Sequence, residues 1–174
     1  MSDHEVTLWP VTSDDQRVLH NLMQFYMYDF TEFGPWDPEE DGSFTYGPLG
    51  RYFDAKWCGP EGRVAFLVRV DGKLAGFAMK RSGQPLLPGG EHSVTEFFVM
   101  KRWRGKGIGK KVAFELFDRF PGVWQVAQMR RNLPAQAFWR KVIGEYTGGR
   151  FEEVDLRSKD WDGPVMVFRS PCLR

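Results

Sequence analysis

The strongest constraint on the fold is a glycine-rich segment that follows a hydrophobic run and precedes a helical pattern. Residues 104–110 read Arg-Gly-Lys-Gly-Ile-Gly-Lys and come shortly after the apolar stretch 97–100. Apolar residues then recur at helical spacing over 107–120, and 123–129 has the composition of a further strand. A strand, a helix and a second strand in this order form a crossover unit, so we expect the two strands to be parallel.

The rest of the chain adds mostly antiparallel strands to this unit. Asp71-Gly72 separates two short apolar runs and is typical of a two-residue hairpin turn. Ser13 and Gln16 have the spacing of a helix capping box. We therefore expect a single α/β (α+β) domain over residues 1–174, with a mixed, mostly antiparallel sheet of about seven strands flanked by helices. The other strands are expected over 5–11, 63–70, 73–80, 92–100, 151–157 and 165–169, and the other helical segments over 13–33, 51–57 and 133–146.

Composition excludes several classes of protein. The 24 Lys and Arg residues against 23 Asp and Glu give a net charge of +1, which offers no basic excess for nucleic acid or an anionic membrane. No apolar run reaches the roughly 18 residues of a membrane span, and the acidic N-terminus lacks a signal peptide, so we expect a cytoplasmic protein. Two distant cysteines, Cys58 and Cys172, and three scattered histidines predict neither a disulfide framework nor a metal site.

The glycine-rich segment has the character of a phosphate-binding loop. Six of the eleven residues in 101–111 are basic, although the chain as a whole is nearly neutral. Free amides at a helix N-terminus, together with the helix dipole, attract anions, and glycines let a ligand approach the backbone. The spacing fits neither the dinucleotide pattern G-x-G-x-x-G nor a P-loop. A solvated basic helix start with turn glycines remains the alternative.

Two stretches resemble the coenzyme A motifs of the GNAT superfamily of N-acetyltransferases. Arg104-x-x-Gly107-x-Gly109 resembles the acetyl-CoA motif, and residues 132–141 resemble the second stretch that contacts CoA in that family. The resemblance extends over nearly the whole chain and is strongest to a bacterial subgroup of predicted acetyltransferases. It implies a single-domain GNAT-like fold, acetyl-CoA as cosubstrate, and transfer of acetyl to a primary amine of a small molecule or peptide by direct attack on the thioester.

The resemblance also implies a role for each matching residue. The amides of residues 105–110 would hold the CoA pyrophosphate, the strand edge at 97–99 would pair with pantetheine, and the Val99 amide would polarise the thioester carbonyl. Core packing remains an alternative role for Phe138 and Trp139, and a solvated helix face for Lys141. The cofactor-binding residues implied in this way are Phe97, Phe98, Val99, Arg104, Gly105, Lys106, Gly107, Ile108, Gly109, Lys110, Asn132, Phe138, Trp139 and Lys141.

Acid–base chemistry is where the sequence departs from the family. The family often has a tyrosine as general acid where this chain has Trp139, and an indole is a poor proton donor. Tyr146, two turns further along the helix, is a weak substitute. Glu96 is the candidate general base, because an otherwise apolar strand would raise its pKa, although a structural ion pair with an arginine is an alternative. His92, earlier in the same expected strand, is the second candidate base. The missing tyrosine also favours a second hypothesis, a CoA-binding module or sensor with little catalysis.

The acceptor side of the site is suggested by a run of acidic residues. No Lys or Arg interrupts residues 29–41, and Phe and Trp side chains are interleaved. Such a segment would attract a cationic amine, although a solvated loop is the simpler interpretation. The acceptor, the acyl group and the oligomeric state are not given by the sequence, and a homodimer is left open. The six acidic residues are Asp29, Glu32, Asp37, Glu39, Glu40 and Asp41.

Overall fold

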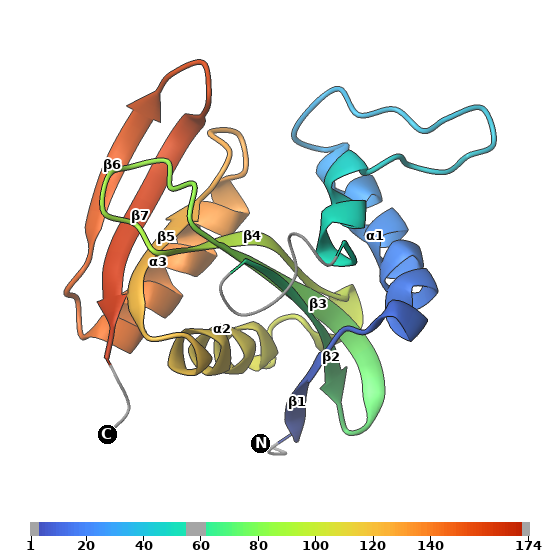
Figure 1. Cartoon of the computed structure of the whole chain (residues 1–174), viewed down its shortest axis with the longest axis horizontal. Helices are drawn as coiled ribbons and strands as arrows, with labels where there is room; N and C mark the ends of the chain where they lie inside the picture. Colours follow the sequence, from blue (N-terminus) through green and yellow to red (C-terminus); the bar gives the residue numbers. More distant parts are fainter. Residues whose placement is uncertain (1–3, 55–61, 172–174) are drawn as a thin grey trace.

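The computed structural model describes residues 4–54 and 62–171, and within them a single seven-stranded sheet in the order β1-β2-β3-β4-β5-β7-β6 (Figure 1). β4 and β5 are parallel, and every other pair of neighbours is antiparallel, which confirms the predicted mixed sheet and crossover unit. The strands are β1 (Val6–Pro10), β2 (Arg63–Val70), β3 (Lys73–Ser82), β4 (His92–Val99), β5 (Gly122–Ala127), β6 (Glu152–Arg157) and β7 (Asp162–Ser170). The α-helices are α1 (Gln16–Phe30), α2 (Ile108–Arg119) and α3 (Leu133–Thr147).

The helices cover opposite faces of the sheet. α2 and α3 contribute Val112, Leu116 and Ile143 to one hydrophobic cluster, while α1 contributes Leu19 and Met23 to another. Figure 1 shows α1 and the loop after it on one side, and the β6–β7 hairpin on the other. All five of these side chains are almost fully buried, so each helix is stabilised mainly by the apolar stripe that it turns toward the sheet.

β4 and β5 separate part of the way along their length. They are paired only over 92–94 and 124–126, so the second half of β4 has no partner on the β5 side. On its other side β4 stays paired to β3, with a bulge at Thr95 between the Lys80–Val94 and Met79–Glu96 pairs. The fold therefore contains an open strand edge inside the sheet. If the pairing continued, the backbone groups of this edge would be bonded to β5.

Local details differ from the sequence predictions at element boundaries. The expected capping box at Ser13 is wrong: the box is formed by Thr12 and Asp15, at the start of a 3-10 turn that precedes α1. A helical segment occurs over Gly47–Tyr52 instead of 51–57, and the last part of the predicted range lies outside the described residues. The predicted turn at Asp71-Gly72 is confirmed, because both residues have the positive φ that it requires.

No helix in the described ranges is long and apolar enough to cross a membrane.

Gly76 keeps β3 close to β4. A Cβ atom at this position would lie 1.9 Å from the backbone oxygen of Phe98, a contact that only movement of the backbone could relieve. We expect Gly76→Ala to lower the free energy of unfolding by about 2 kcal/mol or more, a loss of several degrees in a thermal melt. Gly50→Ala is the matched control, since a Cβ there meets nothing within 4 Å. Equal melting temperatures for the two variants would contradict this packing.

Candidate functional site

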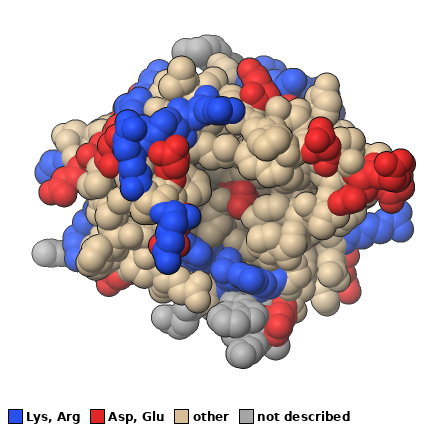
Figure 2. All heavy atoms as spheres, turned by 90° about the horizontal axis from the view of Figure 1, so that it is seen from above, with Lys and Arg blue, Asp and Glu red and all other residues tan. Residues whose placement is uncertain are grey.

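The gap between β4 and β5 opens into a cavity of about 450 Å³. Its walls come from α1, the loop after α1, β4, β5, the start of α3 and the turn between β6 and β7. Figure 2 shows the hollow from above, lined mostly by uncharged side chains, with acidic atoms at its floor. Four of the residues predicted for the site line it: Glu96, Phe97, Asn132 and Trp139.

Glu96 is the acidic group of this cavity. Among the described residues that line it, Glu96 is the only Asp, Glu, Lys, Arg or His. Its two carboxylate oxygens accept hydrogen bonds from the hydroxyls of Tyr26, on α1, and Tyr46, in the loop after α1. An ion pair with arginine, the alternative to a role as base, is absent from the ion pairs found among described residues. The carboxylate is therefore held by neutral donors.

The surroundings of Glu96 favour its protonated form. Burial raises the pKa of the Glu96 carboxyl, and the two tyrosine hydrogen bonds counteract part of that rise. Burial and the nearby Glu96 charge raise the pKa of both Tyr26 and Tyr46, so their hydroxyls stay protonated and act as donors. Glu96 is thus a carboxyl group that binds a proton more tightly than an ordinary glutamate does, which suits a group that accepts a proton.

The open edge of β4 presents backbone amides next to Glu96. The N–H of Met100 bonds to the oxygen of Ala75 on β3, at 2.8 Å. Successive residues of a strand direct their N–H groups to opposite edges, so the N–H of Val99 points to the side that β5 has left. The Phe97 amide, two residues earlier, has the same direction. The side chain of Phe98 instead packs against α1, and by the same alternation its N–H points to β3 and away from the open edge.

The glycine-rich segment lies where β4 leads into α2. Gly105 and Gly107 have φ angles of +75° and +76°, and a Cβ on either would meet nothing within 4 Å. Gly107 precedes the first residue of α2, where backbone N–H groups lack helical partners. Gly109 lies against Phe138, since a Cβ there would be 3.0 Å from the ring. The Ile108 side chain is buried in the core, which leaves only its amide for a ligand.

The basic side chains of this segment have different surroundings. Arg104 donates from Nε to the Val99 oxygen at 2.7 Å and pairs with Asp29 at 2.5 Å, so it ties the end of β4 to α1. Lys110 pairs with Glu145 of α3 at 3.0 Å, and the Lys106 ammonium lies 5.2 Å from the Trp103 ring centre. Both lysines are solvent-exposed and within reach of an anion at the helix start.

The second predicted stretch forms the α3 side of the cavity. The side chain of Asn132 accepts a hydrogen bond from the Ala135 amide at 3.0 Å and caps α3. Trp139 is buried and packs edge-on against Phe97, with ring centres 4.9 Å apart. Phe138 packs edge-on against Trp139 and is tilted relative to Phe97. Lys141 points to solvent on α3. The aromatic residues thus form an apolar wall along the open strand edge, in addition to packing the core.

Several candidates from the sequence lie away from the cavity. His92 contacts Ser82 and the Pro121 oxygen at the start of β4 and does not line the cavity. Tyr146 donates to Asp118 at 2.7 Å and does not line the cavity. Of the acidic segment, Asp29 is paired with Arg104 and with Lys101. The others line no part of the cavity, although Trp36 and Thr45 from the same loop do.

Several lining residues were not identified from the sequence, among them Tyr26, Tyr46, Gln128 and Trp161. Tyr26 lies in the apolar stripe of α1. That pattern indicates a core residue and does not show that the tyrosine hydroxyl reaches the cavity. Trp161 lies between the strands expected over 151–157 and 165–169, where its surroundings depend on how those strands pack. No group of three or more His, Cys, Asp or Glu that could hold a metal is found within 4–54 and 62–171.

Comparison with known proteins identifies relatives of this arrangement. The sequence profile of the acetyltransferase (GNAT) family matches residues 19–144. The chain matches none of the curated proteins. Among solved structures, an acetyltransferase from Thermus thermophilus has a TM-score of 0.64 at 18% identity, over 94% of this chain and 96% of that one.

Two further structures have the same fold. The aminoglycoside acetyltransferase AAC(6')-Ib in complex with coenzyme A has a TM-score of 0.63 at 19% identity, over 95% of each chain. A GNAT-family acetyltransferase from Staphylococcus aureus Mu50 has a TM-score of 0.63 at 13% identity, over 96% of this chain and 100% of that one. At such identities the likeness establishes the fold.

The hydrogen bonds to Glu96 can be tested by removing one of them. Tyr46→Phe takes away a donor that favours the carboxylate, so the pKa of Glu96 should rise further. NMR titration of the carboxyl carbon measures it, and Tyr28→Phe, on the exposed side of α1, is the control. A Glu96 pKa that stays the same or falls in Tyr46→Phe would contradict the arrangement.

The raised pKa also has a consequence for stability. The folded state holds the Glu96 proton more tightly than the unfolded chain, so the stability from this group is complete at low pH. It is lost as the pH rises through the raised pKa. Glu96→Gln should remove this part of the pH dependence, which melting curves between acid and neutral pH would measure. A parent and variant with parallel curves would show that Glu96 does not titrate as described.

Proposed function

The chain belongs to the acetyltransferase (GNAT) family, and from this premise we propose that it is an acetyl-CoA-dependent N-acetyltransferase acting on a primary amine. The amine nitrogen attacks the thioester directly, so a C–N bond forms and the C–S bond breaks. The observation that carries the proposal is Glu96, a buried carboxylate at the cavity beside the open edge of β4. That position suits a group that removes the amine proton.

Glu96 acts as the general base. In its ionised form it takes up the proton that the amine nitrogen loses, and the hydroxyls of Tyr26 and Tyr46 keep its carboxylate oriented. The Val99 amide donates to the carbonyl oxygen on which negative charge develops. Since the carboxylate is the active form, the rate should fall as the pH drops through the raised pKa of Glu96.

The residues at the start of α2 fit the phosphates of coenzyme A, the carrier that supplies the acetyl thioester. Unpaired amides at the helix start and open space over Gly105 and Gly107 favour close approach of an anion. Lys106 and Lys110 are exposed beside them and add positive charge. Phe97, Trp139 and Asn132 then line the path from this helix start into the cavity.

The general acid is missing from its usual place, and this supports a second candidate function. Trp139 is buried against Phe97 and offers no titratable proton, and Tyr146 is bonded to Asp118. A thiol pKa of about 8–9 allows the thiolate to leave unprotonated, which is the route we propose. A CoA-binding module or sensor of the same fold is the alternative, and steady release of free CoA in the presence of an amine separates the two.

The acceptor that we propose is a small-molecule amine. AAC(6')-Ib, which has the same fold, was solved with coenzyme A and kanamycin, and this supports a small-molecule acceptor here. The loop after α1 brings Trp36 and Thr45 to the cavity and carries exposed acids beside them, which supports a positively charged amine. Figure 2 shows acidic side chains gathered at the margin of this face, outside the hollow.

Binding of CoA should stabilise the fold. CoA at about 100 times its dissociation constant adds roughly 2.7 kcal/mol to the free energy of unfolding, which is several degrees in a thermal melt.

Gly107→Asp places a negative charge at the helix start and should weaken CoA binding by at least about tenfold. Gly107→Asn is the matched control, because it has the same shape and the same tolerance of positive φ but no charge. Equal CoA affinities in the two variants would show that the phosphates of CoA do not bind at this loop.

Loss of the base should slow turnover. Glu96→Gln should reduce the rate of CoA thiol release in the presence of amines by about 100-fold or more, with little change in CoA affinity. In the parent, the rate should rise with pH to a plateau, with a midpoint above the usual glutamate pKa of about 4.3. An unchanged rate and pH profile in Glu96→Gln would exclude this residue as the base.

A further inference from the structure

Two polar side chains at the cavity have no partner. Gln128, just beyond the end of β5, is 4% exposed, and neither its amide nitrogen nor its amide oxygen makes a hydrogen bond. The indole nitrogen of Trp161, in the turn between β6 and β7, is also buried and unpaired. Both residues line the cavity that contains Glu96. These are three of the four buried side-chain atoms without a partner within the described residues.

A nearby glutamine shows that the fold can satisfy such a group. Gln125, three residues earlier, is equally buried, yet its oxygen accepts from the amides of Leu86 and Leu87 at 3.0 and 3.1 Å. Its nitrogen donates to the Leu87 oxygen at 2.6 Å. Because unpaired buried polar groups destabilise a protein, unpaired atoms at a cavity indicate a ligand that completes them.

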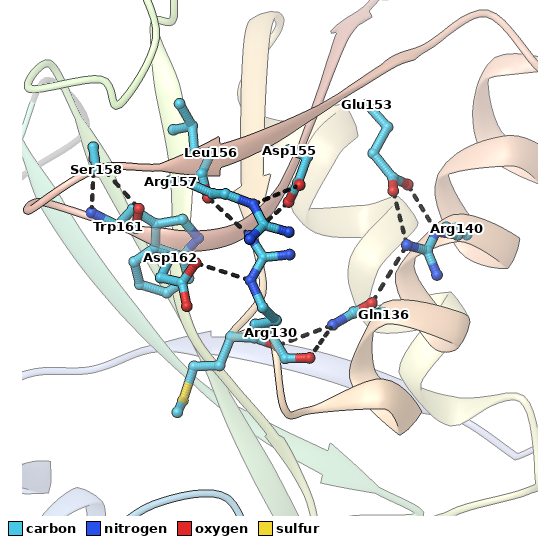
Figure 3. Close-up of polar contacts among 11 residues, drawn as sticks. Arg130, Gln136, Arg140, Glu153, Asp155, Leu156, Arg157, Ser158, Trp161 and Asp162 are labelled. Carbon is cyan, nitrogen blue, oxygen red and sulfur yellow. Dashed lines mark hydrogen bonds and ion pairs between the residues drawn. The ribbon is translucent and has the colours of Figure 1, made fainter.

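The two side chains are held in place by contacts outside the cavity. A Cβ on Gly163 would lie 2.2 Å from the backbone oxygen of Gln128. Glycine therefore lets the β6–β7 hairpin come close to the end of β5. Arg130 bonds to Asp162 at 2.8 Å and to Asp155 at 2.7 Å, which ties β6 and β7 to the loop after β5 (Figure 3). This clamp fixes the hairpin turn that carries Trp161.

The other side of the same loop is anchored to α3. Gln136 donates to the backbone oxygens of Met129 and Arg130, both at 3.0 Å, and Arg140 joins it to Glu153 of β6 (Figure 3). The backbone next to Gln128 is thus held from two directions. A ligand that meets Gln128 and Trp161 would find them positioned in advance.

We propose that Gln128 and Trp161 form an acceptor subsite that binds an uncharged hydroxyl group of the amine substrate. An indole only donates, whereas a glutamine amide both donates and accepts. A hydroxyl matches both, because it accepts from Trp161 and donates to the Gln128 oxygen. A carboxylate does not match, since it cannot donate and no Lys or Arg lines the described part of the cavity. The substrate class is an amino alcohol, whose amine meets Glu96 while its hydroxyl meets this subsite.

This inference rests on the proposed acetylation and makes its acceptor more specific. The test compares primary amines in pairs of equal chain length, one an amino alcohol and the other the plain alkylamine. The parent should favour the amino alcohols by about tenfold or more in kcat/KM. Gln128→Met keeps the size of its side chain, Trp161→Phe keeps an aromatic ring, and each removes the hydrogen-bonding groups. Each should reduce the preference severalfold and leave the KM for acetyl-CoA unchanged.

Controls separate a binding role from a structural one. Gln16→Met, at the exposed start of α1, and Trp9→Phe, on the exposed edge strand β1, should leave the preference as it is in the parent. Gln128→Met should melt at or above the melting temperature of the parent, because it removes an unpaired buried amide. A lower melting temperature would show that Gln128 serves the fold, against the proposal.

Three other results would also overturn the subsite. A parent without preference would mean that the two groups bind only water. A preference that persists in both variants would place hydroxyl recognition elsewhere, and a raised KM for acetyl-CoA would assign the groups to the pantetheine arm. Failure of the proposed function looks different: the parent would acetylate no amine of either series while remaining folded.

Discussion

The separation of β4 from β5 is the constraint on which the rest of the site depends. After the Val94–Val126 pair the two parallel strands no longer bond, and the free edge of β4 faces a cavity inside the sheet. The amides of that edge, the aromatic wall from α3 and the buried carboxylate of Glu96 all meet there. A continuous parallel ladder would use these amides and fill the space in which a substrate must lie. The divergence thus turns a structural sheet into a binding site.

Glu96 illustrates how burial and hydrogen bonding combine. Burial alone would favour a permanently protonated carboxyl, and hydrogen bonds alone would favour a weakly basic carboxylate. The balance between burial and two tyrosine donors yields a carboxylate that is more basic than an ordinary glutamate. An amine about to be acylated needs such a partner, and this is why the proposed chemistry centres on Glu96 more than on the loop that would hold CoA.

The sequence was most informative where local rules determine structure. The Asp71-Gly72 turn, the parallel crossover and the helix that begins after Gly107 follow from turn chemistry and periodicity, and the structure has all three. The residues around Glu96 could not be predicted in this way. Tyr26 and Tyr46 lie 70 and 50 residues from it along the chain, so their contacts depend on how α1 and its loop pack on the sheet. The capping box at Thr12 was missed for a smaller reason, a one-residue shift between two similar polar motifs.

The structure of the protein with CoA bound tests the central claim most directly. The account predicts that the sulfur lies in the cavity beside Glu96, with the pantetheine arm along the amides of Phe97 and Val99. The pyrophosphate should contact the backbone of residues 105–110. CoA bound elsewhere, or with its sulfur outside the gap between β4 and β5, would contradict the account.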